Sequence, residues 1–387
     1  MSKVKPIVVV PGFNGSLLIN KNKLNKKGIN FYSKKQDKTC LTNDVINYKL
    51  LWNKKSKHAT NREQFTTYDF GGIDGICNVV PQLNILDTYF KSIFKLNNNL
   101  IDDYVNYSYF STLTSYLIHK EKYEPGNNLL GFPYDYRYIG DYDNRIEYYV
   151  KIKEYIEKTR IEHDSGIVAI THSLGGLLFH NFLIDYVSET WKRNHIDTII
   201  NVNVPFGGVP QSLFTLFDES SIIYHSYSKY SGLHLCFPNY HNYSNTTPLI
   251  EKVDKDGMVS DSITIDNIFE HELFNEYDSI HYTDLKSFWD TLLKDTNIKT
   301  KYICSKYIND DNNTNCKLNC KKQENNKVVY EYIDSFGDGL VPFESLILHK
   351  NSVNDNAFTF INNTSHANIL KHCDFLEYIA TNICRHP

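Results

Sequence analysis

The sequence predicts an α/β fold with a mostly parallel sheet and helices on both of its faces. Short apolar runs that suit buried strands alternate along the chain with amphipathic segments that suit helices. Strands that alternate with helices form βαβ units, and the strands of such units run parallel. The 387-residue chain is 41% hydrophobic and 22% charged, which supplies a large core and excludes a mainly disordered protein.

The elements are expected in a regular order. The first strand runs from Lys3 to Val10 and ends at Pro11-Gly12. Later strands are predicted over residues 128–132, 166–171, 197–204, 302–305, 328–333 and 357–361. Helices are predicted over residues 107–120, 143–160 and 175–186, with a last helix over 369–383. Residues 20–77 and 210–298 break the alternation and are interpreted as insertions above an edge of the sheet.

Charge, termini and cysteines exclude several classes of function. The chain has 41 basic and 45 acidic residues, and this balance argues against nucleic acid as the principal partner. The apolar run after Lys5 is too short for a signal peptide, and no stretch could span a membrane, so we expect a cytoplasmic protein. The eight cysteines are scattered, and Cys316-x-x-x-Cys320 alone is weak support for a metal site. We therefore expect neither a metal nor a cofactor.

The segment Thr171-His172-Ser173-Leu174-Gly175-Gly176 lies between a predicted buried strand and a predicted helix. This is the context of a nucleophile elbow, in which a sharp turn exposes a serine at the end of a strand. Thr171 departs from the usual G-x-S-x-G pattern, so the motif is a variant. The alternative is an ordinary strand-to-helix turn with Ser173 as the helix N-cap.

A nucleophilic serine needs a histidine base, and the histidine needs an acid that orients it. Asp338 lies between Gly337 and Gly339 just after the predicted strand 328–333, and those glycines allow a sharp turn. Of the fifteen histidines, His366 stands at the junction between the last predicted strand and the last helix. We place His372 inside that helix. The order serine, acid, histidine is that of α/β-hydrolases. The alternative for Asp338 is a plain Gly-Asp-Gly turn.

Acyl transfer also needs backbone N–H groups that stabilise the developing oxyanion. One donor is expected at Leu174, the residue after the serine. The other is expected at Phe13, in the turn Pro11-Gly12-Phe13-Asn14 after the first strand. The alternative is that Pro11-Gly12 only ends that strand.

These segments, in this order, resemble the lecithin:cholesterol acyltransferase and lysosomal phospholipase A2 family of α/β-hydrolases. The resemblance lies in islands over most of the chain. The most specific islands are Pro133-Tyr134-Asp135-Tyr136-Arg137 and Pro205-Phe206-Gly207-Gly208, which are similar to the family's P-Y-D-W-R and A-P-[WF]-G-G segments. Further islands are Val9-Val10-Pro11-Gly12, His172-Ser173-Leu174-Gly175, Gly337-Asp338-Gly339-Leu340-Val341 and Ser365-His366.

The resemblance implies a serine lipid acyl hydrolase or acyltransferase acting on glycerophospholipids. Ser173 would attack the acyl ester, His366 would move the proton, and Asp338 would orient His366. Asp135 and Arg137 are interpreted as a structural ion pair. The acyl group would pass to water or to a lipid alcohol, and the protein would bind a membrane or lipid surface peripherally.

The same resemblance divides the chain into three parts. Residues 1–19, 78–209 and 299–387 would form the catalytic domain, 20–77 a lid or membrane-contact insertion, and 210–298 a cap. Leu50, Leu51 and Trp52 would meet the lipid surface, although Trp52 suits a buried position equally well.

The chain departs from the family pattern at its disulfides. No cysteine precedes Cys40, and His349 stands where a partner for Cys304 would fall, so both family disulfides are expected to be missing. Their loss suits a reducing compartment. Leu340 replaces a threonine beside the acid. Two other functions stay open: a soluble carboxylesterase or thioesterase on the same fold, and a catalytically silent binding protein.

Overall fold

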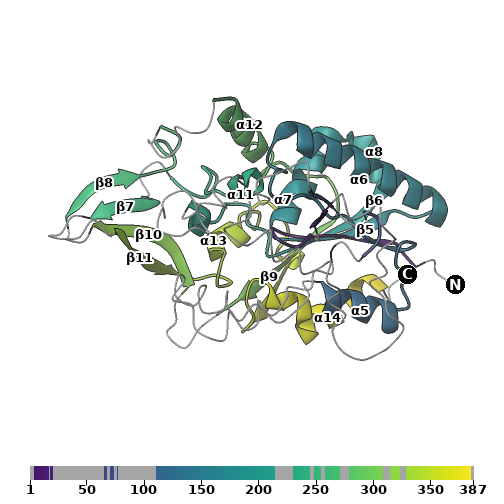
Figure 1. The fold of residues 1–387 in the computed structure, drawn as a ribbon. Helices are drawn as coiled ribbons and strands as arrows, with labels where there is room; N and C mark the ends of the chain where they lie inside the picture. The colour runs from purple at the N-terminus through teal and green to yellow at the C-terminus, as the bar shows by residue number, and fades with distance from the viewer. Residues whose placement is uncertain are drawn as a thin grey trace.

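The computed structural model describes residues 4–16, 18–20, 65–67, 70–73, 76, 110–213, 230–244, 248–253, 258–270, 279–307, 314–322 and 328–384. Its centre is a six-stranded sheet in which every pair of neighbouring strands is parallel (Figure 1). The strands, in spatial order, are β12 (Phe358–Asn362), β9 (Thr300–Lys306), β6 (Ile196–Val202), β5 (Ile167–His172), β1 (Ile7–Val10) and β4 (Leu129–Gly131). The predicted fold class is confirmed.

Helices cover both faces of this sheet because successive side chains of a strand point to opposite sides. In β1, Val8 and Val10 belong to one buried cluster, and Ile7 and Val9 belong to another. Figure 1 shows α6, α7 and α8 over one face and α5 and α14 over the other. These helices are α5 (Ser111–His119), α6 (Tyr142–His163), α7 (Leu174–Asn181), α8 (Glu189–His195) and α14 (Cys373–Ile379).

A second sheet of four strands lies to one side of the central sheet (Figure 1). Its order is β11 (Val328–Ser335), β10 (Thr314–Lys322), β7 (Ile250–Val253) and β8 (Val259–Ile263). Residues 328–333 therefore form a strand, as predicted, but it pairs antiparallel with β10 and is not in the parallel sheet. The physical reason is composition, because Glu331 and Asp334 interrupt the apolar run that a strand buried on both faces requires.

The remaining elements are short. A two-stranded antiparallel sheet joins β2 (Leu18–Asn20) to β3 (Phe65–Thr67). The other helices are α11 (Ser231–His234), α12 (Ser279–Trp289) and α13 (Phe343–Leu346), with 3₁₀ turns at Pro210–Leu213, Asp355–Ala357 and Asn368–Lys371 and π-helical turns at Phe182–Tyr186 and Ala380–Cys384. None of the helices in the described ranges is long and apolar enough to cross a bilayer. The division into catalytic domain, lid and cap stays a prediction, although β7 and β10 come from two of the predicted parts and pair with each other.

The C-terminal segment corrects one expectation. His372 does not lie inside the last helix but caps its N-terminus, since its side chain accepts a hydrogen bond from the N–H of Asp374 at 3.3 Å. The predicted continuous helix is thus a 3₁₀ turn, a break at His372 and then α14. An N-cap residue takes extended backbone angles and interrupts the helix. The apolar spacing of the sequence does not mark this interruption, because apolar residues recur at helical spacing on both sides of it.

The connection between β9 and the turn that holds Asp338 closes on itself. This connection contains β10 and β11, yet its two ends meet, because the Tyr307 N–H donates to the carbonyl of Gly337 at 2.9 Å. Gly337 also pairs with Pro342. As a result, Asp338 lies beside the end of β9, a strand of the central sheet, although the strand before it in sequence belongs to the other sheet.

Unusual backbone angles gather at the carboxyl edge of the central sheet. Asn14, Ser173, Asn203 and Asn363 follow β1, β5, β6 and β12, with φ angles of 61°, 53°, 46° and 56°. Non-glycine residues rarely adopt positive φ, and such angles cluster at functional sites. The carboxyl edge of an open parallel sheet is also where α/β proteins place their ligands. The carboxyl edge of the central sheet is therefore the expected place of a functional site.

Candidate active site

The turn between β5 and α7 holds Ser173 at the carboxyl edge of the sheet. Ser173 has φ 53° and ψ −131°, and its N–H donates to the carbonyl of Val202 at 3.1 Å. Thr171, the departure from the usual pattern, is fully buried and donates its hydroxyl to Oδ1 of Asn201 at 2.8 Å. Gly176 leaves room for it, since a Cβ there would lie 3.0 Å from Oγ1 of Thr171. The larger residue thus fits because its hydroxyl finds a partner on β6.

His366 connects Ser173 to Asp338 through two hydrogen bonds. Nε2 of His366 lies 2.9 Å from Oγ of Ser173, and Nδ1 lies 2.6 Å from Oδ2 of Asp338. The residues His366, Ser173 and Asp338 are 4%, 8% and 0% exposed. The structure therefore brings together three residues that the sequence analysis selected from distant segments.

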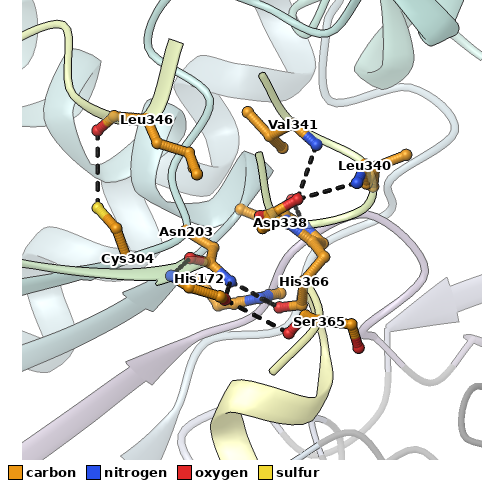
Figure 2. A network of polar contacts seen from close by, with 11 residues as sticks. His172, Asn203, Cys304, Asp338, Leu340, Val341, Leu346, Ser365 and His366 are labelled. Atoms are coloured by element: carbon orange, nitrogen blue, oxygen red, sulfur yellow. Dashed lines mark hydrogen bonds and ion pairs between the residues drawn. The ribbon is translucent and has the colours of Figure 1, made fainter. Parts of the chain in front are cut away.

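The turn around Asp338 satisfies its second oxygen. The N–H groups of Leu340 and Val341 donate to Oδ1 at 2.9 and 2.7 Å, as Figure 2 shows. These donors belong to the main chain, so the leucine that replaces a threonine at position 340 does not remove them. With Oδ1 held by two N–H groups, Oδ2 is directed at the imidazole of His366.

The turn after β1 packs backbone to backbone against the start of α7. A Cβ on Gly175 would lie 2.2 Å from the carbonyl oxygen of Pro11, a separation that only glycine permits. The same carbonyl accepts a hydrogen bond from the hydroxyl of Tyr134 at 2.8 Å. Phe13 and Leu174, the two predicted oxyanion donors, follow Pro11 and precede Gly175 within these two packed segments. Their role stays a prediction.

Asp135 and Arg137 form the ion pair that the sequence analysis predicted. Nε of Arg137 donates to Oδ1 of Asp135 at 2.9 Å, and Nη2 donates to Oδ2 at 2.6 Å. The side chain of Arg137 is 1% exposed and that of Asp135 is 24% exposed. Burial would lower the pKa of Arg137, but the hydrogen bonds and charge of Asp135 outweigh burial and raise it. The pair is next to Tyr136, whose ring meets that of Phe13 at 5.2 Å.

Two side chains that the sequence analysis did not select reach the main chain of His366. Nε2 of His172 lies 2.8 Å from the carbonyl oxygen of His366, and Nδ2 of Asn203 donates to the same oxygen at 3.0 Å. Burial, followed by the nearby His366, lowers the pKa of His172 well below its usual value, so this imidazole is neutral. A signal for Asn203 existed in the sequence, because asparagine tolerates positive φ and follows a buried strand there.

Metal ligands and lid residues lie apart from these contacts or outside the described residues. Within the described ranges, His372, Cys373 and Asp374 bring one ligand atom each within 4.8 Å of one another, but Cys373 and Asp374 are exposed. Cys304 is buried in β9, and burial raises the pKa of its thiol. Cys40, Leu50, Leu51, Trp52 and Cys77 lie outside the described residues, as do the side chains of Cys316 and Cys320.

Comparison with known proteins gives a family match and several relatives. The model of the lecithin:cholesterol acyltransferase family matches residues 78–333, a range that contains Ser173 and ends before Asp338 and His366. A phospholipid:diacylglycerol acyltransferase of Schizosaccharomyces pombe is 32% identical over 102 residues, which cover 24% of this chain and 16% of that protein. A lysosomal phospholipase A and acyltransferase of Bos taurus is 26% identical over 220 residues, covering 54% of this chain and 50% of that protein.

The matched segments span half or less of the length of these relatives. A phosphatidylcholine-sterol acyltransferase of Rattus norvegicus is 26% identical over 219 residues, covering 53% of this chain and 44% of that protein. Among solved structures, that of the Tle4–Tli4 complex aligns with a TM-score of 0.60 at 11% identity and covers all of this chain and 99% of its own. At that identity the likeness concerns the fold alone.

Proposed function

Because this chain belongs to the lecithin:cholesterol acyltransferase family, we propose that it cleaves a fatty acyl ester of a glycerophospholipid through a serine acyl-enzyme. The observation that carries the proposal is the hydrogen-bonded series from Ser173 through His366 to Asp338, almost wholly buried at the carboxyl edge of the sheet. This is the arrangement of a nucleophile, a general base and an orienting acid. The relatives' names include both phospholipase and acyltransferase, so water and a lipid alcohol are both kept as acceptors.

In the first half of the reaction, Oγ of Ser173 attacks the ester carbonyl carbon while Nε2 of His366 takes the hydroxyl proton. The carboxylate of Asp338 stabilises the imidazolium that forms, and it keeps Nδ1 protonated. We propose that the N–H groups of Phe13 and Leu174 hold the oxyanion of the tetrahedral intermediate, each contributing about 3 kcal/mol to transition-state stabilisation. The intermediate collapses when His366 gives its proton to the departing glycerol oxygen.

In the second half, His366 removes a proton from water or from a lipid alcohol, and that oxygen attacks the acyl group on Ser173. The second tetrahedral intermediate releases a fatty acid or an acylated alcohol, and Oγ recovers its proton from His366. No atom in this scheme requires a metal or an organic cofactor. Since the substrate is held in a lipid surface, we propose that the protein reaches that surface peripherally.

The test is acyl release from phospholipid vesicles, with and without an added lipid alcohol, by wild type and Ser173→Ala. We expect free fatty acid or acylated alcohol from wild type and a loss of roughly 10⁴-fold or more in the variant. Ser165→Ala is the matched control, because Ser165 lies just before the opposite end of β5 and its hydroxyl donates to the adjacent carbonyl of Gly166 at 3.1 Å. The control should keep wild-type turnover.

Other outcomes point to the alternative functions. Serine-dependent cleavage of short soluble esters, with no turnover on vesicles, would replace the proposal by a carboxylesterase. If the wild-type protein does not react with a serine-directed phosphonate, the result would favour the alternative of a catalytically silent binding protein. Equal activity in wild type and Ser173→Ala would show that another residue is the nucleophile.

A further inference from the structure

The main-chain carbonyl of His366 is held by two side chains that come from neighbouring strands. Nε2 of His172, the last residue of β5, lies 2.8 Å from this oxygen. Nδ2 of Asn203, the residue after β6, donates to it at 3.0 Å. Figure 2 shows both side chains converging on the loop that carries His366. A carbonyl oxygen has two lone pairs, so this arrangement fills both.

Asn203 has little freedom to point elsewhere. Its Oδ1 accepts the N–H of Ser305 at 2.8 Å, which directs Nδ2 to the carbonyl of His366 and to the hydroxyl of Ser305. That hydroxyl in turn donates to the carbonyl of Ser365 at 3.4 Å. The carbonyls of two successive residues, Ser365 and His366, are therefore tied to the ends of β6 and β9. The positive φ of Asn203 is the cost of this placement.

His172 contributes as a neutral donor. A carbonyl oxygen can only accept a hydrogen bond, so Nε2 of His172 carries a proton and donates it to the carbonyl oxygen of His366. The rings of His172 and His366 are 4.8 Å apart. A charged ring at His172 would oppose the imidazolium that His366 becomes during the proposed reaction. Its neutral state thus suits a neighbour that has to accept a proton.

We propose that Asn203 and His172 are positioning residues that fix the peptide of His366, so that its Nε2 stays aligned with the hydroxyl of Ser173. The inference rests on the proposed function. Asp338 already holds His366 at Nδ1, and its carbonyl accepts the N–H of His366 at 2.8 Å. Neither of those two contacts touches the peptide that follows, and the carbonyl oxygen of His366 lies in the plane of that peptide. The clamp on that carbonyl therefore adds a constraint beyond those at Nδ1 and the N–H.

The first test removes the amide donor of Asn203 with two variants, of which one keeps the shape of the side chain. Asn203→Asp retains tolerance for positive φ and, in its ionised form, has no donor for the carbonyl. Asn203→Gly keeps the backbone angle and removes the side chain, and with it the donor in every protonation state. We expect kcat to fall roughly tenfold to hundredfold in both, with KM within about twofold of wild type. The rate at which a serine-directed phosphonate labels Ser173 should fall by the same factor.

Asn181→Ala is the control for the loss of a buried asparagine. Asn181 bonds to Tyr149, Asp185 and Thr291 and touches none of the three proposed catalytic side chains. It should lower the melting temperature as the Asn203 variants do but leave kcat and the labelling rate unchanged. A second pair tests His172: His172→Gln keeps an amide donor and should retain more labelling than His172→Phe. This pair decides the question if neither Asn203 variant folds.

A spectroscopic measurement is independent of turnover. Nδ1 of His366 and Oδ2 of Asp338 are 2.6 Å apart, and the proton on Nδ1 should give a far-downfield resonance. The resonance is assigned by its loss in Asp338→Asn. In Asn203→Asp the resonance should shift upfield or broaden. If wild type shows neither turnover nor labelling, the proposed function fails, while this resonance still tests the clamp. The inference would be overturned if Asn203→Gly kept the wild-type kcat, labelling rate and resonance, or if only its KM rose.

Discussion

Replacement of Gly175 by alanine should impair catalysis far more than folding, because the added methyl group would strike the turn after β1. Its Cβ would lie 2.2 Å from the carbonyl oxygen of Pro11 and 2.7 Å from that of Val10, where real Cβ contacts stay beyond 3.0 Å. Both obstacles are main-chain atoms that cannot swing aside. The start of α7 and the turn must therefore separate by about 1 Å.

That separation acts on the proposed oxyanion donors. Leu174 precedes Gly175 and Phe13 lies two residues after Pro11, so the two N–H groups move apart with their segments. A misplacement of about 1 Å typically costs roughly a hundredfold in rate, and full loss of one donor costs about 10²–10³ in kcat. We expect a fall of about a hundredfold. Strain of about 1–3 kcal/mol is partly offset by the better helix propensity of alanine, worth about 1 kcal/mol.

The assay measures phosphonate labelling of Ser173, ester turnover and urea unfolding for three variants. Gly166→Ala is the matched control just before β5, since its Cβ would lie 3.1 Å from the main-chain nitrogen of Asp197, a tight contact but a milder one than those at Gly175. In Gly176→Ala the new Cβ would lie 2.1 Å from Cγ2 of Val204, which belongs to a side chain and not to the turn after β1. This variant should therefore lose more stability than activity. A folded Gly175→Ala protein with labelling and turnover within threefold of wild type would refute the reasoning.

Two further predictions concern stability. Asp135→Asn should lower the free energy of unfolding by about 2 kcal/mol, because it removes a negative charge that pairs with the buried guanidinium of Arg137, while the exposure of Asp135 moderates the loss. A change below about 0.5 kcal/mol in urea titration would contradict this. Burial lowers the pKa of His349 to about 4. Between pH 6.5 and about pH 4, His349 is therefore protonated in the unfolded chain and neutral in the folded chain. The free energy of unfolding falls over this range by about 1.4 kcal/mol per pH unit as the pH decreases. His349→Phe should reduce the loss of stability between pH 7 and pH 5 by about 2 kcal/mol, and an unchanged difference would exclude this histidine as the cause.

The sequence was most informative where a local pattern determines the structure. Continuous apolar runs such as Ile167-Val168-Ala169-Ile170 predicted parallel strands, because a strand buried on both faces needs apolar residues throughout. Ser173, Asp338 and His366 were selected because each follows a predicted strand. That reasoning needed only strand order and the residue type at each junction, both of which are visible in one sequence.

Features that depend on pairing between distant segments were not predictable in the same way. Nothing local shows that residues 328–335 pair with β10, or that Asp338 returns to the end of β9. The short helix α8 was missed, although Ser188 is a typical N-cap and accepts the N–H of Trp191 at 3.2 Å. The clamp formed by Asn203 required the distance between two loops, and a sequence does not contain that distance.

The closed connection between Tyr307 and Gly337 has a consequence for changes in the length of this chain. The Tyr307 N–H bonds to the carbonyl of Gly337 at 2.9 Å, and the carbonyl of Asp338 accepts the N–H of His366 at 2.8 Å. Asp338 is therefore held by contacts that lie outside the connection. Doubling the length of a flexible loop costs only about 0.6 kcal/mol of closure entropy. A longer segment between β10 and β11 is therefore expected to leave the carboxylate in place. New surface can be added here without a change in chemistry.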